Sequence, residues 1–118
     1  MLHGLDLVVM EVPSVAALRD FYVNTLGFAV ELDGQQFIQL RRPGADGASL
    51  ALSESANARP TSNPQIWWYV DDADATCAEL AQRGVEIGEQ PHDMPFGRVF
   101  TLHDPAGNTL YALQLRAA

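Results

Sequence analysis

Residues 5–28 read LDLVVMEVPSVAALRDFYVNTLGF, and they predict a strand followed by a helix and a helix stop. Leu5–Val12 is rich in Val, Leu and Met, which is typical of a strand. Ser14, just after Pro13, is a preferred N-cap residue, and apolar residues then recur at helical spacing. Gly27 can adopt the left-handed conformation that ends a helix. This stretch therefore predicts a strand over 5–12 and a helix over 15–26.

The second half of the chain repeats the order of elements found in the first. After the first helix, short strands are expected at 28–32, 36–40 and 49–53, with turns at Gly34 and at 43–47. The second half opens with a strand at 66–70, and Asp72 or Asp74 then caps a helix that Gly84 ends. Strands at 85–89, 99–103 and 109–115 follow. Each half therefore reads as one strand–helix–strand–strand–strand module.

These two βαβββ modules predict the fold class and the organisation of the chain. We expect an α+β fold in which two curved mixed sheets surround a cleft, with the helices outside. Module one covers residues 1–54, a small polar linker covers 55–63, and module two covers 64–118. At 118 residues the two modules are expected to form a single domain.

Side chains alternate between the two faces of a strand, which separates cleft-facing from helix-facing residues. The residues expected to face the cleft are Leu7, Val9 and Glu11 in the first strand, Gln65, Trp67 and Tyr69 in the fifth, and Tyr111 and Leu113 in the last. Those expected to face the helices are Val8, Met10, Val12, Ile66, Trp68, Val70, Leu110 and Ala112.

The amino-acid composition limits the kinds of partner and the cellular location that we expect for the chain. The chain has seven Arg, no Lys and fifteen acidic residues, for a formal net charge of −8. The negative electrostatic field of such a chain repels nucleic acid and anionic membrane surfaces. No apolar run approaches the ~20 residues of a membrane span, and the N-terminus lacks the basic flank of a signal peptide, so a cytoplasmic location is expected. The single cysteine, Cys77, falls on the apolar stripe of the second helix and is expected to be buried.

Four stretches of the sequence resemble the vicinal oxygen chelate superfamily. They are DFYVNTLGF at 20–28, VDD at 70–72 followed by Leu80 and Gly84, FGR at 96–98, and DPAGN at 104–108. That superfamily includes glyoxalase I, extradiol dioxygenases, fosfomycin-resistance enzymes and bleomycin-binding proteins. The resemblance covers nearly the whole chain, and it implies paired βαβββ modules and a homodimer.

The resemblance also implies where a divalent metal would bind in the enzymes of the superfamily. The four ligand positions correspond to Leu7, a position near Ala51, Gln65 and Tyr111. Leu and Ala have no donor atom, so the three or four convergent donors of a transition-metal site are not present. The remaining candidates do not replace them, because His3, His92 and His103 are scattered and Asp71 and Asp72 stand where acids cap a helix. We therefore expect no metal, no other cofactor and no catalytic residue.

Among the members without a metal, the chain is most similar to the bleomycin-binding resistance proteins. The similar features are two aromatic residues at alternate positions of the fifth strand, Trp67 and Tyr69, and the stretch GRVFTLHDPAGN at 97–108. A flat cationic aromatic compound could stack on these rings, and acids such as Glu11, Glu54 or Asp93 could attract it. The predicted ligand-binding residues are Trp67, Tyr69, Phe37, Gln65, Tyr111, Leu7, Val9 and Arg98.

Other interpretations of these residues remain open. The Trp67-Trp68-Tyr69 run could pack on both sides of a central strand, Arg98 could be a rim residue paired with an acid, and Tyr111 could fill the space of the missing metal. The sequence thus favours a non-enzymatic protein that sequesters a hydrophobic or cationic aromatic small molecule, such as a bleomycin-type antibiotic. The alternatives are a metal-dependent lyase, isomerase or dioxygenase of the superfamily, and a regulatory or interaction module whose groove is filled by its own side chains.

Overall fold

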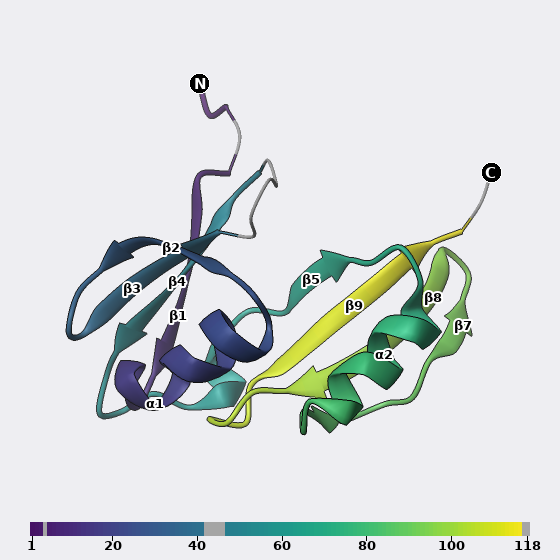
Figure 1. The fold of residues 1–118 in the computed structure, drawn as a ribbon. Coiled ribbons are helices and arrows are strands. Elements are labelled where there is room, and N and C mark those ends of the chain that lie inside the picture. Colours follow the sequence, from purple (N-terminus) through teal and green to yellow (C-terminus); the bar gives the residue numbers. More distant parts are fainter. Residues whose placement is uncertain (4, 42–46, 117–118) are drawn as a thin grey trace. The chain divides into compact units, whose positions relative to one another are not determined.

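The computed structural model describes residues 1–3, 5–41 and 47–116, and it divides the chain into two compact units, Met1–Asn63 and Pro64–Ala118. Each unit contains one β-sheet and one main helix (Figure 1). The expected α+β class with two sheets is therefore confirmed. The turn expected at 43–47 lies, apart from Gly47, outside the described residues.

The first unit forms a four-stranded sheet with the strand order β1-β4-β3-β2. Its elements are β1 (Leu7–Val12), α1 (Val15–Asp20), a π-helical segment (Phe21–Thr25), β2 (Ala29–Asp33), β3 (Phe37–Arg41), β4 (Ser49–Glu54) and a short 3-10 turn (Pro60–Ser62). The first strand runs parallel to β4, and the other neighbours are antiparallel.

The second unit repeats this order as β5-β9-β8-β6, again with a parallel pair at one edge. Its elements are β5 (Ile66–Tyr69), α2 (Ala73–Gln82), β6 (Glu86–Ile87), β7 (His92–Met94), β8 (Gly97–His103) and β9 (Thr109–Leu115). Residues 92–94, between the strands expected at 85–89 and 99–103, form the extra strand β7 against β8. The predicted repeat of elements is otherwise present in both units.

The two main helices begin and end by the same local chemistry. Ser14 Oγ accepts a hydrogen bond from Ala17 N at 3.2 Å, and Asp72 Oδ1 accepts one from Ala75 N at 3.1 Å. Asp72 rather than Asp74 is therefore the N-cap of α2. Gly27 and Gly84 both have a φ of 85°, the left-handed conformation that a glycine adopts at a helix end.

The helix expected over 15–26 is helical but not uniform. Leu26 N donates to Phe21 O at 2.9 Å, five residues back, so the last turn is a π-helix. Within it Tyr22 has no exposed surface, and its ring contacts those of Phe21 and Phe28. The wider turn thus buries one aromatic ring of the motif at 20–28 in the core of the first unit.

Each core lies between a sheet and its helix. In the first unit the buried residues are Met10, Val12, Ile38, Leu40, Leu50 and Leu52 from the sheet and Val15, Leu18 and Tyr22 from the helical segment. In the second, the buried residues between sheet and helix include Phe100, Leu102, Leu110 and Ala112 from the sheet and Ala73 and Cys77 from α2. Val99, Thr101 and Leu113 are buried as well, on the opposite face of the sheet. Burial raises the pKa of the Cys77 thiol above its ordinary value. These residues confirm the predicted burial of Met10, Val12, Leu110, Ala112 and Cys77.

The segment expected to be a linker, 55–63, belongs to the first unit. Ser55 N donates to Val12 O at 2.9 Å, which ties the start of the segment to the end of β1. At its other end, the Asn63 side chain accepts from Glu11 N at 3.1 Å and donates to Glu11 O at 3.0 Å. The Asn63 amide thus satisfies two backbone groups at the edge of β1, as a neighbouring strand would.

In the part of the chain that the structure describes, neither main helix has the length or the apolar character needed to cross a bilayer.

Candidate functional site

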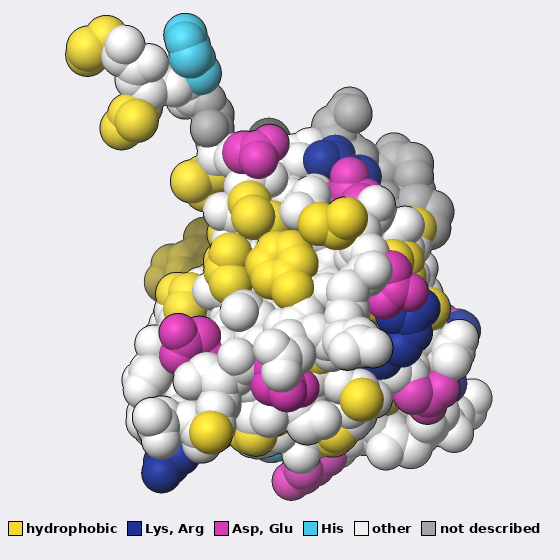
Figure 2. Space-filling model, turned by 90° about the vertical axis from the view of Figure 1, so that its left-hand side faces the viewer, with side chains coloured by type: hydrophobic (Ala, Val, Ile, Leu, Met, Phe, Trp, Pro, Cys, Tyr) yellow, Lys and Arg dark blue, Asp and Glu magenta, His cyan; other side chains and the backbone are white. Residues whose placement is uncertain are grey.

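The predicted residues of the first unit share the sheet face that α1 leaves open. The register places Leu7 beside Ser49 and Val9 beside Ala51, while Phe37 lies beside Ser53. Alternation then puts Leu7, Val9 and Phe37 on one face. Val9 is 44% exposed, and Figure 2 shows hydrophobic side chains gathered on this side of the molecule with acidic side chains around them.

A group of polar side chains lies on the same face, toward the Ser49 end of β4. The Ser49 hydroxyl donates to the Glu31 carboxylate and accepts from Arg41 Nη2 at 3.1 Å. Arg41 Nε also lies 3.3 Å from Glu31 Oε2. The hydrogen bond from Ser49, together with Arg41 and Gln39, lowers the pKa of Glu31. The charges of Arg41 and Glu31 cancel, so this group adds no net charge to the face. Its character is therefore set by the apolar residues Leu7, Val9 and Phe37.

The predicted residues of the second unit meet around Trp67. The Trp67 and Tyr111 rings are stacked, with centroids 4.5 Å apart and planes 15° from parallel. This pairing follows from the sheet, because β5 and β9 are adjacent and place Trp67 beside Tyr111. The Trp67 indole N–H donates to Gln65 Oε1 at 3.3 Å. The structure therefore brings Trp67, Gln65 and Tyr111 together, and Trp67 stays 40% exposed.

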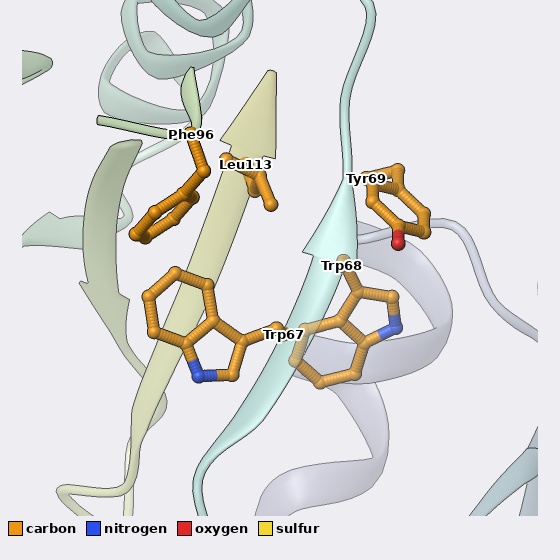
Figure 3. Close-up of a pocket in the computed structure, with 5 residues that line it drawn as sticks. All are labelled: Trp67, Trp68, Tyr69, Phe96 and Leu113. Atoms are coloured by element: carbon orange, nitrogen blue, oxygen red, sulfur yellow. The ribbon is translucent and has the colours of Figure 1, made fainter. Parts of the chain in front are cut away.

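A shallow apolar depression of about 330 Å³ adjoins this stack. It is lined by Trp67, Trp68, Tyr69, Phe96 and Leu113, and Figure 3 shows Trp67 close to Phe96 and Leu113, with Trp68 and Tyr69 to the other side of β5. The Phe96 ring lies edge-on to Trp67 with centroids 6.2 Å apart. Tyr69, at 69% exposure, stands at the margin of the depression.

Sequence reasoning missed two of these residues. The sequence predicts Phe96 only as part of the motif at 96–98, although an aromatic residue between Pro95 and Gly97 indicates an exposed turn. Alternation predicts that Trp68 faces the helix, but it is only half-buried and it lines the depression. Leu113 lies on the open face, as alternation predicts, and it is largely buried.

Arg98 lies elsewhere. Its Nε and Nη2 donate to the two carboxylate oxygens of Asp74 in α2 at 2.9 and 3.1 Å, and its Nη1 donates to Asp93 at 3.0 Å. The structure thus gives Arg98 the second role that the sequence left open, ion pairing with acids. These hydrogen bonds raise the pKa of Arg98 and lower that of Asp74.

Two of the three acids suggested as attractors of a cation are already bound. Glu54 Oε1 accepts from Val15 N at 2.9 Å at the start of α1, and Asp93 pairs with Arg98. Glu11 is exposed at the open face of β1.

The comparisons with known proteins agree on the family. The model of the Glyoxalase/Bleomycin resistance protein/Dioxygenase superfamily matches residues 4–111. The chain belongs to this superfamily. No curated protein sequence matches the chain.

Several solved structures of the superfamily fold are similar to this chain over its whole length. TnmS3, an antibiotic binding protein from Streptomyces sp. CB03234, is 32% identical with a TM-score of 0.81, and the match covers 98% of both chains. The bleomycin-binding protein from bleomycin-producing Streptomyces verticillus, crystallised with copper(II)-bleomycin, is 27% identical with a TM-score of 0.76. That match covers 98% of this chain and 100% of the other. A superfamily member from Sphaerobacter thermophilus DSM 20745 is 29% identical with a TM-score of 0.78, covering 96% and 98%.

The superfamily also contains metal enzymes, so the donor set of this chain decides whether a metal fits. At the corresponding positions, Leu7 and Ala51 have hydrocarbon side chains and Tyr111 is stacked on Trp67. Gln65 alone offers a neutral oxygen, and that oxygen accepts the Trp67 N–H. Within the described residues, no group of three or more His, Cys, Asp and Glu side chains could hold an ion. The residues at these superfamily positions do not fit a divalent metal.

The DPAGN stretch at 104–108, part of the superfamily resemblance, closes the hairpin between β8 and β9. The buried Asp104 carboxylate accepts from Ala106 N, from Asn108 N and from the Asn108 side chain at 2.9–3.0 Å. Asp104 N in turn donates to Asn108 O at 3.0 Å. Gly107, with a φ of 88°, takes the left-handed position of the loop. This stretch therefore serves the fold, and it contributes nothing to the aromatic depression.

Proposed function

We propose that this protein binds an aromatic small molecule without transforming it, and that it acts by sequestration in the cytoplasm. The observation that carries the proposal is the aromatic group of the second unit, in which Trp67, stacked on Tyr111, lines an open apolar depression together with Phe96. A depression of about 330 Å³ is at the lower end of the sizes of ligand sites, so it accommodates one planar ring system of a larger compound.

The stack has a free surface that a ligand can use. Tyr111 covers one face of the Trp67 indole, and Phe96 meets it edge-on, which leaves 40% of the Trp67 surface exposed. Aromatic rings prefer offset-stacked or edge-to-face neighbours at the distances found here. A planar ligand ring would extend this arrangement by one more layer.

The charge of the second unit favours a cationic ligand. Residues 64–118 contain eight acidic residues and three arginines, and Arg83 and Arg98 are paired with acids of the same unit. A negative field raises the local concentration of a cation, and a cation over the Trp67 ring gains a further cation–π attraction. The two similar antibiotic-binding structures make a bleomycin-type antibiotic the first compound to test.

The donor set supports a passive role. Leu7 and Ala51 cannot polarise a substrate through a metal, because they have no atom with which to hold one. In the described residues, the carboxylates of Asp74 and Asp93 are paired with Arg98, and that of Glu31 is bound by Arg41 and Ser49. Two hydroxyls lie beside a possible base, Ser49 beside Glu31 and Thr109 beside His103, but neither lines the aromatic depression.

The test is a fluorescence titration of the purified protein with bleomycin and with ethidium, a smaller cationic aromatic. Saturable quenching of tryptophan emission is expected. Trp67→Leu removes the stacking surface and should weaken binding by about 2 kcal/mol, roughly 30-fold in Kd. Phe21→Leu, a matched loss of a half-buried aromatic ring in the helical segment of the first unit, should leave Kd unchanged.

Two results would contradict the proposal. One is the absence of saturable quenching with both compounds. The other is about one equivalent of Ni, Zn, Fe or Mn in protein purified without chelator, because a tightly held metal would favour a lyase, isomerase or dioxygenase of the superfamily.

A further inference from the structure

The hairpin that carries Phe96 has few attachments of its own. β7 has three residues and pairs with β8 only, and Met94 opposite Gly97 leaves Pro95 and Phe96 as a two-residue turn. Asp93, Met94 and Phe96 are all exposed. A short, exposed edge strand contributes little packing, so its position depends on specific side-chain contacts.

Arg98 supplies such a contact from the neighbouring strand. It lies directly opposite Asp93 in the β7–β8 ladder, and its Nη1 donates to Asp93 Oδ1 at 3.0 Å. Its other donors reach Asp74, with Nε to Oδ2 at 2.9 Å and Nη2 to Oδ1 at 3.1 Å. One guanidinium thus connects the edge strand, β8 and the first turn of α2.

The anchor at Asp74 is firm. A bidentate arginine–carboxylate pair fixes both distance and orientation. Asp74 lies in the first turn of α2, just after the N-cap Asp72, where a carboxylate is also favoured by the helix dipole. α2 in turn is packed on the sheet through Ala73 and Cys77. The connection from Arg98 therefore leads from the core of the unit to its most weakly attached strand.

This connection affects the position of Phe96, which lies three residues after Asp93 in the same hairpin. Arg116 N donates to Phe96 O at 3.1 Å, which holds the backbone of the turn against the end of β9. With both ends of the turn held, the Phe96 ring stays beside Trp67. If β7 moved away from β8, this ring would leave the depression and Trp67 would lose one of its two aromatic neighbours.

We propose that Arg98 is a positioning residue of the ligand site, because its links to Asp74 and Asp93 hold the β7–β8 hairpin so that Phe96 forms one wall of the aromatic depression. This inference rests on the proposed function for its effect on affinity. The arginine acts from the opposite side of the strand and does not contact the ligand. The width available to a planar ligand beside Trp67 is thereby set by an ion pair.

The first test needs no ligand. Asp93→Ala removes only the link to the hairpin, and at 84% exposure of the Asp93 side chain it does not endanger folding. Arg98→Ala removes the whole connection. Glu79→Ala breaks the separate exposed ion pair with Arg83 on α2 and serves as the matched control. Amide hydrogen exchange of residues 92–97 should accelerate in the first two variants and stay unchanged in the control.

Acrylamide quenching of Trp67, measured in a Trp68→Phe background, reports the position of Phe96 directly. Quenching should increase with Asp93→Ala and not with Glu79→Ala. If neither the exchange rates nor the quenching change in Asp93→Ala and Arg98→Ala, the inference is wrong, whatever the protein binds.

The second test is a double-mutant cycle in the titration with bleomycin and ethidium. Arg98→Ala should weaken binding about fivefold in the wild-type background and hardly at all in Phe96→Ala, because the lost interaction is the one that Phe96 makes. An equal loss in both backgrounds would show that Arg98 does not act through Phe96. If the wild type binds neither compound, the proposed function fails, and exchange and quenching decide the inference by themselves.

Discussion

Gly97 is the position at which the smallest substitution should have the largest effect on the second unit. It lies at the junction of the β7–β8 turn with β8, opposite Leu115. A Cβ at this residue would meet the backbone oxygen of Gln114 at 2.2 Å and Leu113 Cδ1 at 2.9 Å. Since real Cβ contacts are essentially never under 3.0 Å, β8 and β9 would have to separate by about 0.8 Å at this point.

The neighbour cannot relieve this contact by rotating, because the Gln114 oxygen belongs to the sheet ladder. Gly97→Ala should therefore lower the free energy of unfolding by about 2 kcal/mol, as overpacking of a rigid site does. For a chain of this size that is a fall in Tm of roughly 8 °C. The displaced turn should also move Phe96, so binding of the aromatic probe should weaken together with stability.

Urea unfolding and calorimetry measure the stability, and Gly84→Ala is the control. A Cβ at Gly84 meets nothing within 4 Å. Gly84→Ala therefore measures only the cost of placing alanine in a left-handed backbone conformation, about 1 kcal/mol. A Gly97→Ala protein within 0.5 kcal/mol of the wild type would refute the steric argument. So would a loss no larger than that of Gly84→Ala.

Four further predictions concern other parts of the chain and its assembly. Asp104→Ala should lower the free energy of unfolding by about 3 kcal/mol in urea, because it leaves three buried or half-buried donors without their carboxylate, and a change under 1 kcal/mol would contradict this. Asp74, whose pKa is lowered mainly by the hydrogen bond from Arg98, should contribute stability that is present above the ordinary carboxyl pKa and is lost as the pH falls through its lowered value. In acid unfolding followed by circular dichroism, the stability of Asp74→Asn should therefore fall less with decreasing pH than that of the wild type. Identical unfolding curves for the two proteins would contradict a stabilising Asp74–Arg98 ion pair. Asn63→Ala should lower the free energy of unfolding by about 1 kcal/mol. It should also accelerate hydrogen exchange of the Glu11 backbone amide, because that amide donates to Asn63 Oδ1. The chain is also expected to be a homodimer, and light scattering that gives a 12.9 kDa particle at micromolar concentration would exclude it.

Much of the fold could be predicted because its signals are local. The caps Ser14 and Asp72 and the stop residues Gly27 and Gly84 mark both helices by their own chemistry, and each is found where the sequence places it. The alternation in β1 was equally readable, since Met10 and Val12 are buried and Val9 is exposed. Period-two burial needs no knowledge of the neighbouring strand.

What could not be predicted depends on contacts between distant residues. β7 has no alternation of its own, and it becomes a strand through pairing with β8. Arg98 could be placed at a strand entrance, but its main partner Asp74 lies 24 residues away on α2, which only the packed unit shows. The π-helical turn at 21–25, in which Tyr22 is fully buried, has no local signal that distinguishes it from an ordinary α-helical turn. The binding roles of the eight residues chosen from the sequence stay predictions.

The hydrogen bonds of Asp104 change how a genome survey should treat the DPAGN signature. Because this loop closes a hairpin and does not line the depression, a match to it reports architecture and says nothing about what the protein binds or catalyses. To sort such sequences by activity, a survey should instead compare the alternate residues of β5 with the residues beside them in β9. There, Tyr111 is stacked on Trp67 at a position where the superfamily resemblance implies a metal ligand in the enzymes.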